Sequence, residues 1–186
     1  MVLAIWVYLL IGRGGFWRAS ERDDKTPVWG GPWPAIAAVI PARDEAECVA
    51  ETVASLLRQD YPGDFTLVLV DDGSRDATAQ VACQAAAQLG AIERLQVLPG
   101  RSLPAGWTGK LWAQHQGVEL ALGAARAPDF LLLTDADIVY AADALRLLVA
   151  RAQTGDYVLT SLMAKLRCQT LAERAFIPAF IFFFQM

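Results

Sequence analysis

A short apolar run that ends in two closely spaced carboxylates places the strongest constraint on how this chain can fold. The run is Phe130–Leu133, and Asp135 and Asp137 follow it one residue apart. Four residues are too few for a typical helix, so the run predicts a strand buried on both faces. Open α/β sheets form their ligand crevices at the carboxyl ends of such strands. We therefore expect both carboxylates at a binding edge of a sheet.

The same two carboxylates predict a bound cation. At about 5 Å and an effective dielectric constant of about 20, two such charges repel each other by roughly 3 kcal/mol. A divalent cation relieves this repulsion, and carboxylate oxygens suit Mg²⁺ or Mn²⁺. The alternative is a turn that ends the strand and leaves Asp135 and Asp137 solvated.

Other apolar runs in the chain have a similar form. Ala35–Ile40 and Phe65–Val70 predict two more buried strands, and Leu95–Leu98 predicts a short one. Helical patterns separate them, and this alternation predicts an α/β fold with a mainly parallel sheet. Charged residues that follow the strands should meet at one edge, and they are Arg43, Asp44, Glu45, Asp71, Asp72, Asp135 and Asp137. A site that binds a nucleotide and holds a metal on its diphosphate explains these carboxylates better than structural need does.

The patterns between the strands predict where helices begin and which faces they bury. Asp44 and Glu47 have the spacing of a capping pair at a helix start. Thr108 can cap a later helix, and Gly109 and Lys110 would lie in its first turn, where backbone N–H groups attract phosphate. The face of this helix expected in the core comprises Leu111, His115, Val118 and Leu122. We therefore expect His115 to be a packed or hydrogen-bonded core histidine rather than a ligand. A helix over 142–153 and a strand over 157–162 should follow.

Size and charge exclude several classes of protein. The chain has 186 residues, enough for one full α/β domain, and 55% of them are hydrophobic. The net charge of −4 argues against a protein that binds nucleic acid by neutralising phosphates. The three cysteines lie far apart and have no zinc-site spacing, so we expect neither a disulfide framework nor a zinc site.

Both ends of the chain are apolar. Residues 1–11 form an unbroken apolar run that would reach only about 17 Å as a helix, against roughly 30 Å of bilayer core. Arg13 and Arg18 follow it, as at a cytoplasmic membrane interface. We expect the end of a membrane helix or an interfacial anchor, with a buried N-terminus as the alternative. Residues 175–186 are again apolar without a helix stop, and we expect a natural continuation.

Four blocks of sequence, in this order, resemble the family 2 glycosyltransferases. They are residues 39–45 (VIPARDE), 55–62 (SLLRQDYP), 70–74 (VDDGS) and 135–137 (DAD). The resemblance covers about residues 35–140. It implies the GT-A fold, a nucleotide-sugar donor and a transfer that inverts the sugar carbon. On this basis we expect a membrane-associated segment (1–18), a linker (19–34), a GT-A nucleotide-sugar-binding domain (35–174) and the start of a second apolar membrane-associated segment (175–186).

The resemblance also implies roles for individual residues. Asp135 and Asp137 would hold a divalent metal, Mg²⁺ or Mn²⁺, on the diphosphate, and Asp72 would contact the base. The residues expected to bind the nucleotide are Pro41, Arg43, Glu45, Asp72, Lys110 and Asp135. No catalytic base can be assigned, because the family takes it from a segment well beyond the metal motif. We expect the base beyond Met186 and expect this chain alone to be inactive.

A further block narrows the expected acceptor. Residues 106–113 (GWTGKLWA) resemble the hopene-associated glycosyltransferases, and carotenoid glycosyltransferases have a similar block. Lys110 in this block would contact the diphosphate as a point charge. The expected function is transfer from a UDP-sugar to a lipid acceptor, a hopanoid or related polyprenoid. The expected location is the inner membrane, with the catalytic domain on the cytoplasmic side.

Three alternative functions remain open. One is a carotenoid or polyprenyl glycosyltransferase, and another is a catalytically incomplete nucleotide-binding module at the membrane. The third is a nucleotidyltransferase, which needs a Gly-rich basic loop directly after the first strand. Residues 41–45 lack such a loop, which counts against this alternative.

Overall fold

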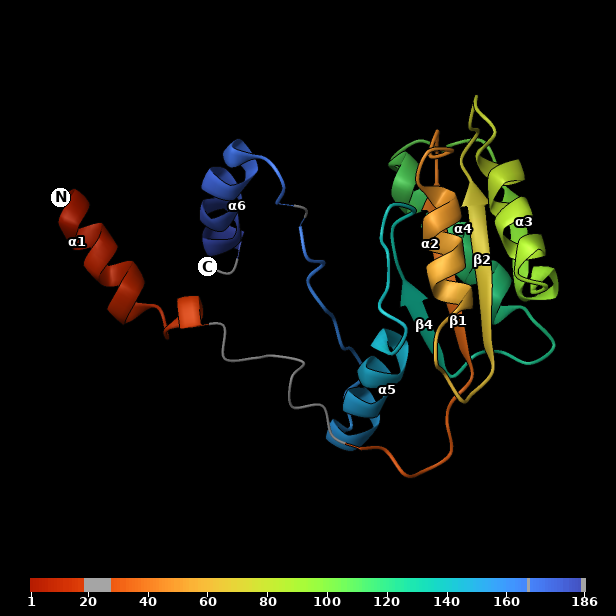
Figure 1. Cartoon of the computed structure of the whole chain (residues 1–186), viewed down its shortest axis with the longest axis horizontal. Coiled ribbons are helices and arrows are strands. Elements are labelled where there is room, and N and C mark those ends of the chain that lie inside the picture. Colours follow the sequence, from red (N-terminus) through yellow and green to blue (C-terminus); the bar gives the residue numbers. More distant parts are fainter. Residues whose placement is uncertain (19–27, 167, 185–186) are drawn as a thin grey trace. The chain divides into compact units, whose positions relative to one another are not determined.

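The computed structural model of the chain describes residues 1–18, 28–166 and 168–184. It has two compact units, one comprising Val28–Thr160 and the other comprising Met1–Pro27 together with Ser161–Met186. The first unit contains the sheet and is an α/β layer structure (Figure 1). The fold class expected from the sequence is therefore confirmed.

Four parallel strands form the sheet of the larger unit. They are β1 (Ile36–Ala42), β2 (Phe65–Asp71), β3 (Leu95–Pro99) and β4 (Phe130–Leu133), in the spatial order β3-β2-β1-β4. Ala42 at the end of β1 pairs with Asp71 at the end of β2, and Asp71 pairs with Pro99 at the end of β3. β4 ends opposite Val39, three residues before the end of β1. The loop after β4 therefore lies beside the last residues of β1.

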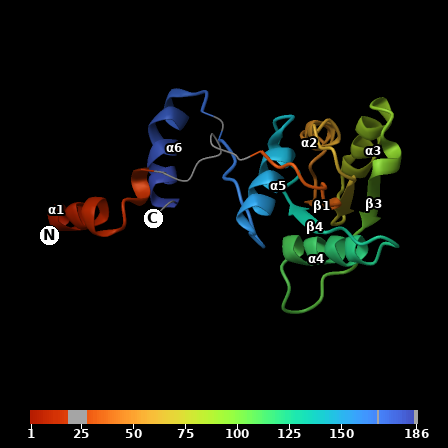
Figure 2. The same ribbon diagram turned by 90° about the horizontal axis from the view of Figure 1, so that it is seen from below.

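Helices cover both faces of this sheet, as Figure 2 shows. On one face, the side chains of Ile36, Ala38 and Ile40 share a core with α2 (Val49–Leu57), α3 (Thr78–Gln88) and α5 (Ala144–Gly155). A short 3₁₀ helix, Ile92–Arg94, connects α3 to β3. On the other face, the alternate residues Ala37 and Val39 pack against α4 (Gly109–Leu122). Because successive side chains of a strand point to opposite faces, β1 is buried along its whole length.

Helix α4 buries three small residues and one glutamine rather than the face that the sequence predicted. Its buried residues are Ala113, Gln116, Gly117 and Ala121. A Cβ atom on Gly117 would lie 2.4 Å from Cγ1 of Val39 and 2.9 Å from Cγ2 of Val70, so the helix backbone packs directly on β1 and β2. Leu111 and Leu122 are more than half exposed, and the expectation that they lie in the core is wrong. Large side chains cannot occupy a helix face that lies this close to a sheet.

Two strand predictions also need correction. β4 forms an edge of the sheet and its residues are only partly buried, with Leu133 exposed, so it is not a strand buried on both faces. The expected strand over 157–162 is absent, because the described residues there form no strand and are mostly exposed. Apolar composition identified both segments, but composition does not show whether a neighbouring strand pairs with them.

The smaller unit consists of apolar helices that bury no residue. They are α1 (Val2–Val7), a π-helix (Tyr8–Gly12), a 3₁₀ helix (Phe16–Arg18) and α6 (Leu171–Phe184). Aromatic rings contact each other within this unit, with centroids 5.9 Å apart for Trp6 and Phe182 and 5.0 Å apart for Phe16 and Phe182. Residues 19–27 of the expected linker lie outside the described residues. In the part of the chain that the structure describes, no helix is both long and apolar enough to cross a bilayer.

The tight packing at Gly117 leads to a prediction about stability. We expect Gly117→Ala to lower the free energy of unfolding by about 1–3 kcal/mol, because the added methyl group forces α4 away from Val39 and Val70. Gly30→Ala is the matched control, because Gly30 has no neighbouring atom within 4 Å of the added group. Urea denaturation of both variants checks this. Equal stability of the two variants would contradict the close approach of α4.

Candidate active site

A pocket of about 360 Å³ opens at the carboxyl edge of the sheet. Its walls come from the ends of β1 and β2, the first turn of α4 and the loop after β4. The lining residues are Pro41, Ala42, Arg43, Glu45, Asp72, Gly109, Lys110, Ala113, Asp135, Ala136 and Asp137. Every residue that the sequence nominated for the nucleotide or the metal is among them. The structure brings these residues together, while their individual roles stay predictions.

Backbone hydrogen bonds fix the end of β2 beside the ends of its neighbours. The amide of Asp72 donates to the carbonyl of Ala42 at 2.9 Å, and the amide of Gly100 donates to the carbonyl of Asp71 at 2.8 Å. Gly73 then turns the chain with a φ of 71°, a conformation that glycine adopts without strain. The Asp72 carboxylate lies 3.6 Å from Nη1 of Arg43. Asp72, the residue expected to contact the base, is therefore held on the pocket wall.

The loop after β1 is bound to the loop after β2 by reciprocal hydrogen bonds. The amide of Asp44 donates to the Ser74 hydroxyl at 3.0 Å, and Oδ1 of Asp44 accepts from the amide of Arg75 at 2.7 Å. The amide of Glu45 donates to the Thr78 hydroxyl at 2.9 Å. Asp44 adopts a φ of 55° in this loop. Its side chain bonds to the loop after β2 and does not cap a helix. Because α2 begins only at Val49, the predicted Asp44 and Glu47 capping pair is wrong.

Helix α2 holds the loop that carries Asp135 and Asp137. The fully buried Thr52 donates its hydroxyl to the carbonyl of Ala136 at 2.7 Å, between the two aspartates. The amide group of Gln59 donates to the carbonyl of Ala141 at 2.8 Å, and its oxygen accepts from the amide of Leu145 at 2.9 Å. Sequence reasoning missed Thr52, and it found Gln59 only as part of the resembling block at residues 55–62. Polar residues on the inward face of α2 and directly after its end are the signal that could have identified them.

A second anchor lies at the end of β4. The hydroxyl of Tyr140 donates to the Thr134 hydroxyl at 2.6 Å, and the amide of Tyr140 donates to the Ser55 hydroxyl at 3.1 Å. Burial raises the pKa of Tyr140, so its hydroxyl stays a donor at neutral pH. The segment that contains both aspartates is therefore fixed at each end, at Thr134 and at Tyr140.

The first turn of α4 closes the pocket from the opposite side. The Nζ atom of Lys110 lies 2.6 Å from Oδ1 of Asp135. A Cβ atom on Gly109 would lie 2.9 Å from Oδ2 of Asp72, so the backbone of this turn lies close to the Asp72 carboxylate. Thr108 occupies the N-cap position as expected, but its side chain makes no capping hydrogen bond. The start of α4 is therefore placed directly against two of the pocket's carboxylates.

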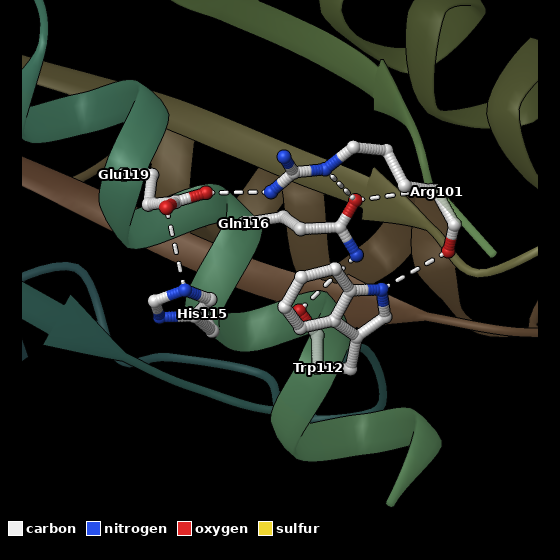
Figure 3. A network of polar contacts seen from close by, with 5 residues as sticks. All are labelled: Arg101, Trp112, His115, Gln116 and Glu119. Atoms are coloured by element: carbon white, nitrogen blue, oxygen red, sulfur yellow. Dashed lines mark hydrogen bonds and ion pairs between the residues drawn. The ribbon is translucent and has the colours of Figure 1, made fainter. Parts of the chain in front are cut away.

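A network of polar contacts ties α4 to the loop after β3 (Figure 3). Gln116 is only 2% exposed, and its oxygen accepts from the amide of Arg101 at 2.7 Å. The indole N–H of Trp112 donates to the carbonyl of Arg101 at 3.1 Å. His115 is partly exposed, with its Nε2 atom 3.3 Å from Oε1 of Glu119, and its ring stacks on Trp112. The expectation of a core histidine is wrong, because α4 turns this face outward.

The electrostatics of the pocket favour a cation. Its lining carries four carboxylates, those of Glu45, Asp72, Asp135 and Asp137, against the two cationic side chains of Arg43 and Lys110. Burial, together with a hydrogen bond to Glu45, raises the pKa of the neighbouring Cys48 thiol to about 12, so this thiol is neutral. The excess of two negative charges would repel a nucleotide diphosphate that arrived without a metal.

The residues present fit a metal that is shared with a nucleotide. Mg²⁺ is held in many sites by one or two carboxylates together with substrate phosphates and water. Asp135 and Asp137 line one pocket and supply two such carboxylates. Within the described residues, no group of three or more His, Cys, Asp or Glu side chains is arranged to hold a metal ion. The arrangement therefore suits a metal that the diphosphate helps to bind.

Comparison with known proteins identifies the family of this chain. A sequence model described as "Glycosyl transferase family 2" matches residues 37–184. An N-acetylglucosaminyltransferase of Mesorhizobium japonicum is 28% identical over 148 residues, which are 79% of this chain and 32% of the relative. An N-acetylglucosaminyltransferase of Rhizobium meliloti is 37% identical over 60 residues, 32% of this chain and 14% of the relative. The chain thus spans about a third or less of these curated relatives.

Solved structures with a similar fold include two sugar-nucleotide complexes. The mannosyltransferase PcManGT from Pyrobaculum calidifontis, in complex with GDP-Man and Mn²⁺, has a TM-score of 0.53 at 24% identity, over 82% of this chain and 44% of that chain. S. aureus TarS 1–349 in complex with UDP-GlcNAc has a TM-score of 0.50 at 21% identity, over 64% of this chain and 31% of that chain. At these identities the likeness establishes the fold.

The hydrogen bond from Thr52 to Ala136 leads to a prediction about the site. Thr52→Val keeps the shape of the side chain but leaves the Ala136 carbonyl without its donor. We expect a loss of about 1–2 kcal/mol in the free energy of unfolding. We also expect severalfold weaker metal-dependent UDP binding, because the loop between Asp135 and Asp137 loosens. Denaturation and calorimetry measure the two effects.

Thr66→Val is the matched control for this prediction. Thr66 lies on β2 with its side chain exposed, so the same replacement should change stability by no more than about 0.5 kcal/mol. If Thr52→Val bound UDP as tightly as the control, α2 would not position the two aspartates.

Proposed function

Because the chain belongs to glycosyl transferase family 2, we propose that it binds a nucleotide sugar with a divalent metal and serves the inverting transfer of that sugar to a lipid acceptor. Its larger unit has the GT-A fold. The observation that carries the proposal is the pocket at the carboxyl edge of the sheet. Residues separated by almost a hundred positions in the sequence, from Pro41 to Asp137, meet there.

The donor is proposed to be a UDP-sugar. The two curated relatives are named N-acetylglucosaminyltransferases, and one structural neighbour was solved in complex with UDP-GlcNAc. Asp72 and Arg43 lie on the wall where a base and ribose would offer hydrogen-bonding groups. Lys110, in the first turn of α4, lies where a diphosphate would meet both its ammonium group and backbone N–H groups.

The metal is proposed to bind Asp135 and Asp137 together with the diphosphate. A structural neighbour was solved in complex with Mn²⁺, which supports this type of ion. When bound, the metal would neutralise charge that develops on the leaving diphosphate. The residues of the chain contribute the geometry, because Thr52 and Tyr140 hold the acidic loop in place.

The acceptor is proposed to be a membrane lipid, a hopanoid or related polyprenoid. The support is the resemblance of residues 106–113 to hopene-associated glycosyltransferases and the exposed apolar side chains of α1 and α6. We further propose attachment to the cytoplasmic face of the inner membrane, because UDP-sugars are cytosolic and Arg13 and Arg18 follow the first apolar run. Attachment would raise the effective concentration of a lipid acceptor near the pocket.

A nucleotide-binding module without catalysis is the second candidate. Among the described residues, the pocket lining includes no carboxylate that follows Asp137 in the sequence. Asp143 lies at the start of α5, and Glu173 accepts hydrogen bonds from the amides of Gln169 and Thr170 in the smaller unit. We therefore assign no catalytic base. Detectable sugar transfer by the protein would exclude this second candidate.

Removal of one carboxylate tests the donor site. We expect Asp137→Asn to weaken Mn²⁺-dependent UDP binding by at least about tenfold. Mutation of residues that only hydrogen-bond to a metal ligand already lowers metal affinity by about tenfold or more. The amide keeps the shape of the side chain, so lost packing is not the cause. Addition of a chelator to the wild type should have the same effect, and titration calorimetry measures both.

Asp143→Asn is the control for this experiment, because it removes the same charge from a residue that does not line the pocket. It should bind UDP as the wild type does. Equal UDP affinity of Asp137→Asn and the wild type would refute the assignment of the metal site. No UDP binding by the wild type with Mn²⁺ would refute the donor proposal.

Membrane binding and lipid transfer test the acceptor proposal. We expect the protein to sediment with membranes and to stay bound at high salt, because burial of apolar surface is not screened by ions. With the full-length protein, label from UDP-sugars should then enter the lipid extract. Deletion of residues 1–12 should weaken membrane binding and leave UDP binding intact. A wild-type protein that stays in the supernatant at low salt without detergent would contradict the proposal.

A further inference from the structure

Lys110 already holds one of the carboxylates that the proposed function assigns to the metal. Its Nζ atom lies 2.6 Å from Oδ1 of Asp135, and both side chains line the same pocket. A metal ion binds a carboxylate oxygen at about 2.0–2.1 Å for Mg²⁺. An ammonium group and a divalent ion on the same carboxylate would repel each other strongly at such distances. Each of the two cations therefore weakens the binding of the other to Asp135.

We propose that Lys110 is an exchangeable cation that occupies the metal position on Asp135 until the metal and the nucleotide arrive together. Asp135 would then hold the metal, and the released ammonium group of Lys110 would contact the diphosphate. This inference rests on the proposed function and deepens it, because it assigns Lys110 two partners in succession. It also makes Lys110 a competitor of the metal in the absence of nucleotide and a partner of the nucleotide in its presence.

The contacts around Lys110 allow this exchange without movement of the backbone. The side chains of Lys110 and Asp135 are 61% and 49% exposed, and ion pairs that water reaches to this extent are weak and easily replaced. The start of α4 is fixed, because Gly109 lies against Asp72 and Gln116 ties the helix to Arg101. Rotation about side-chain bonds is therefore enough to redirect the ammonium group.

The charges of the pocket explain why such a competitor would be useful. Four carboxylates face two cationic side chains, so the lining would attract free metal ions if Lys110 were absent. With Lys110 on Asp135, a metal that arrives alone must displace the ammonium group without offering it a phosphate oxygen in return. A metal that arrives with a diphosphate offers the ammonium group new oxygen partners. The exchange therefore favours joint binding of metal and nucleotide.

The proposal predicts effects of opposite sign in one variant. We expect Lys110→Gln to bind Mn²⁺ alone about two- to fivefold more tightly than the wild type, the range expected from loss of an exposed ion pair. The same variant should bind UDP, at saturating Mn²⁺, about tenfold or more weakly, because a charge-assisted hydrogen bond to the diphosphate is lost. Electron paramagnetic resonance of free Mn²⁺ and calorimetry with UDP measure these two affinities.

Arg126→Gln is the matched control. Arg126 forms an ion pair of the same length, 2.6 Å, with Asp64, and their side chains are 78% and 70% exposed. Both residues precede strands, so this pair lies at the opposite, amino-terminal edge of the sheet. Arg126→Gln also removes one positive charge and one ion pair, and it should change neither affinity. A gain in Mn²⁺ affinity equal to that of Lys110→Gln would attribute the effect to net charge and overturn the proposal.

A second variant isolates the pair itself. On an Asp135→Asn background, Lys110→Gln should no longer increase Mn²⁺ affinity, because the shared carboxylate is gone. Unchanged or weaker binding of Mn²⁺ alone by Lys110→Gln, or no measurable binding by either protein, would overturn the exchange. These results are distinct from failure of the proposed function, which would show as wild-type protein that binds no UDP with Mn²⁺.

Discussion

The repulsion among carboxylates at one edge of the sheet is the constraint on which this structure depends. Parallel pairing brings the ends of β1 and β2 level, and β4 ends three residues earlier, so Glu45, Asp72, Asp135 and Asp137 share one pocket. Such a cluster is unfavourable in a folded protein unless cations lie among its members. Arg43 and Lys110 supply two of them. The remaining negative charge is the physical reason to expect a divalent ion with the nucleotide.

Buried hydrogen bonds behind the pocket maintain this unfavourable arrangement. Thr52 on α2 and Gln59 just after this helix hold the acidic loop, and Gln116 on α4 holds the loop after β3. Within the described residues, no buried side-chain nitrogen or oxygen lacks a hydrogen-bond partner. Buried polar groups left without partners are costly, so each bond selects one backbone arrangement over its alternatives. The helices thus contribute to the site although few of their side chains line it.

The sequence predicted the sheet and the pocket residues because both depend on local patterns. A short apolar run that ends in carboxylates marks a strand and its carboxyl end, and parallel strands bring those ends together. The errors concern packing between distant segments. Leu111 was predicted to lie in the core, but the close packing at Gly117 leaves it exposed. The β4 segment was predicted to be buried on both faces, but it is an edge strand and only partly buried. The position of Thr52 opposite Ala136 likewise depends on contacts across 84 residues.

In the proposed function, the fixed part of the pocket holds the donor, and the Lys110 side chain controls whether the metal binds before the donor does. Backbone pairing and the buried threonine and glutamine side chains fix where the carboxylates lie, and nothing in that framework needs to move. The Lys110 side chain is long and mostly exposed, and it extends from a fixed helix turn. It can therefore change partners by rotation about its own bonds while the backbone stays in place. Glutamate or aspartate at position 110 would add to the repulsion, and alanine could not reach Asp135. A long cationic side chain at the start of α4 therefore suits a site that must be stable before and after the donor binds.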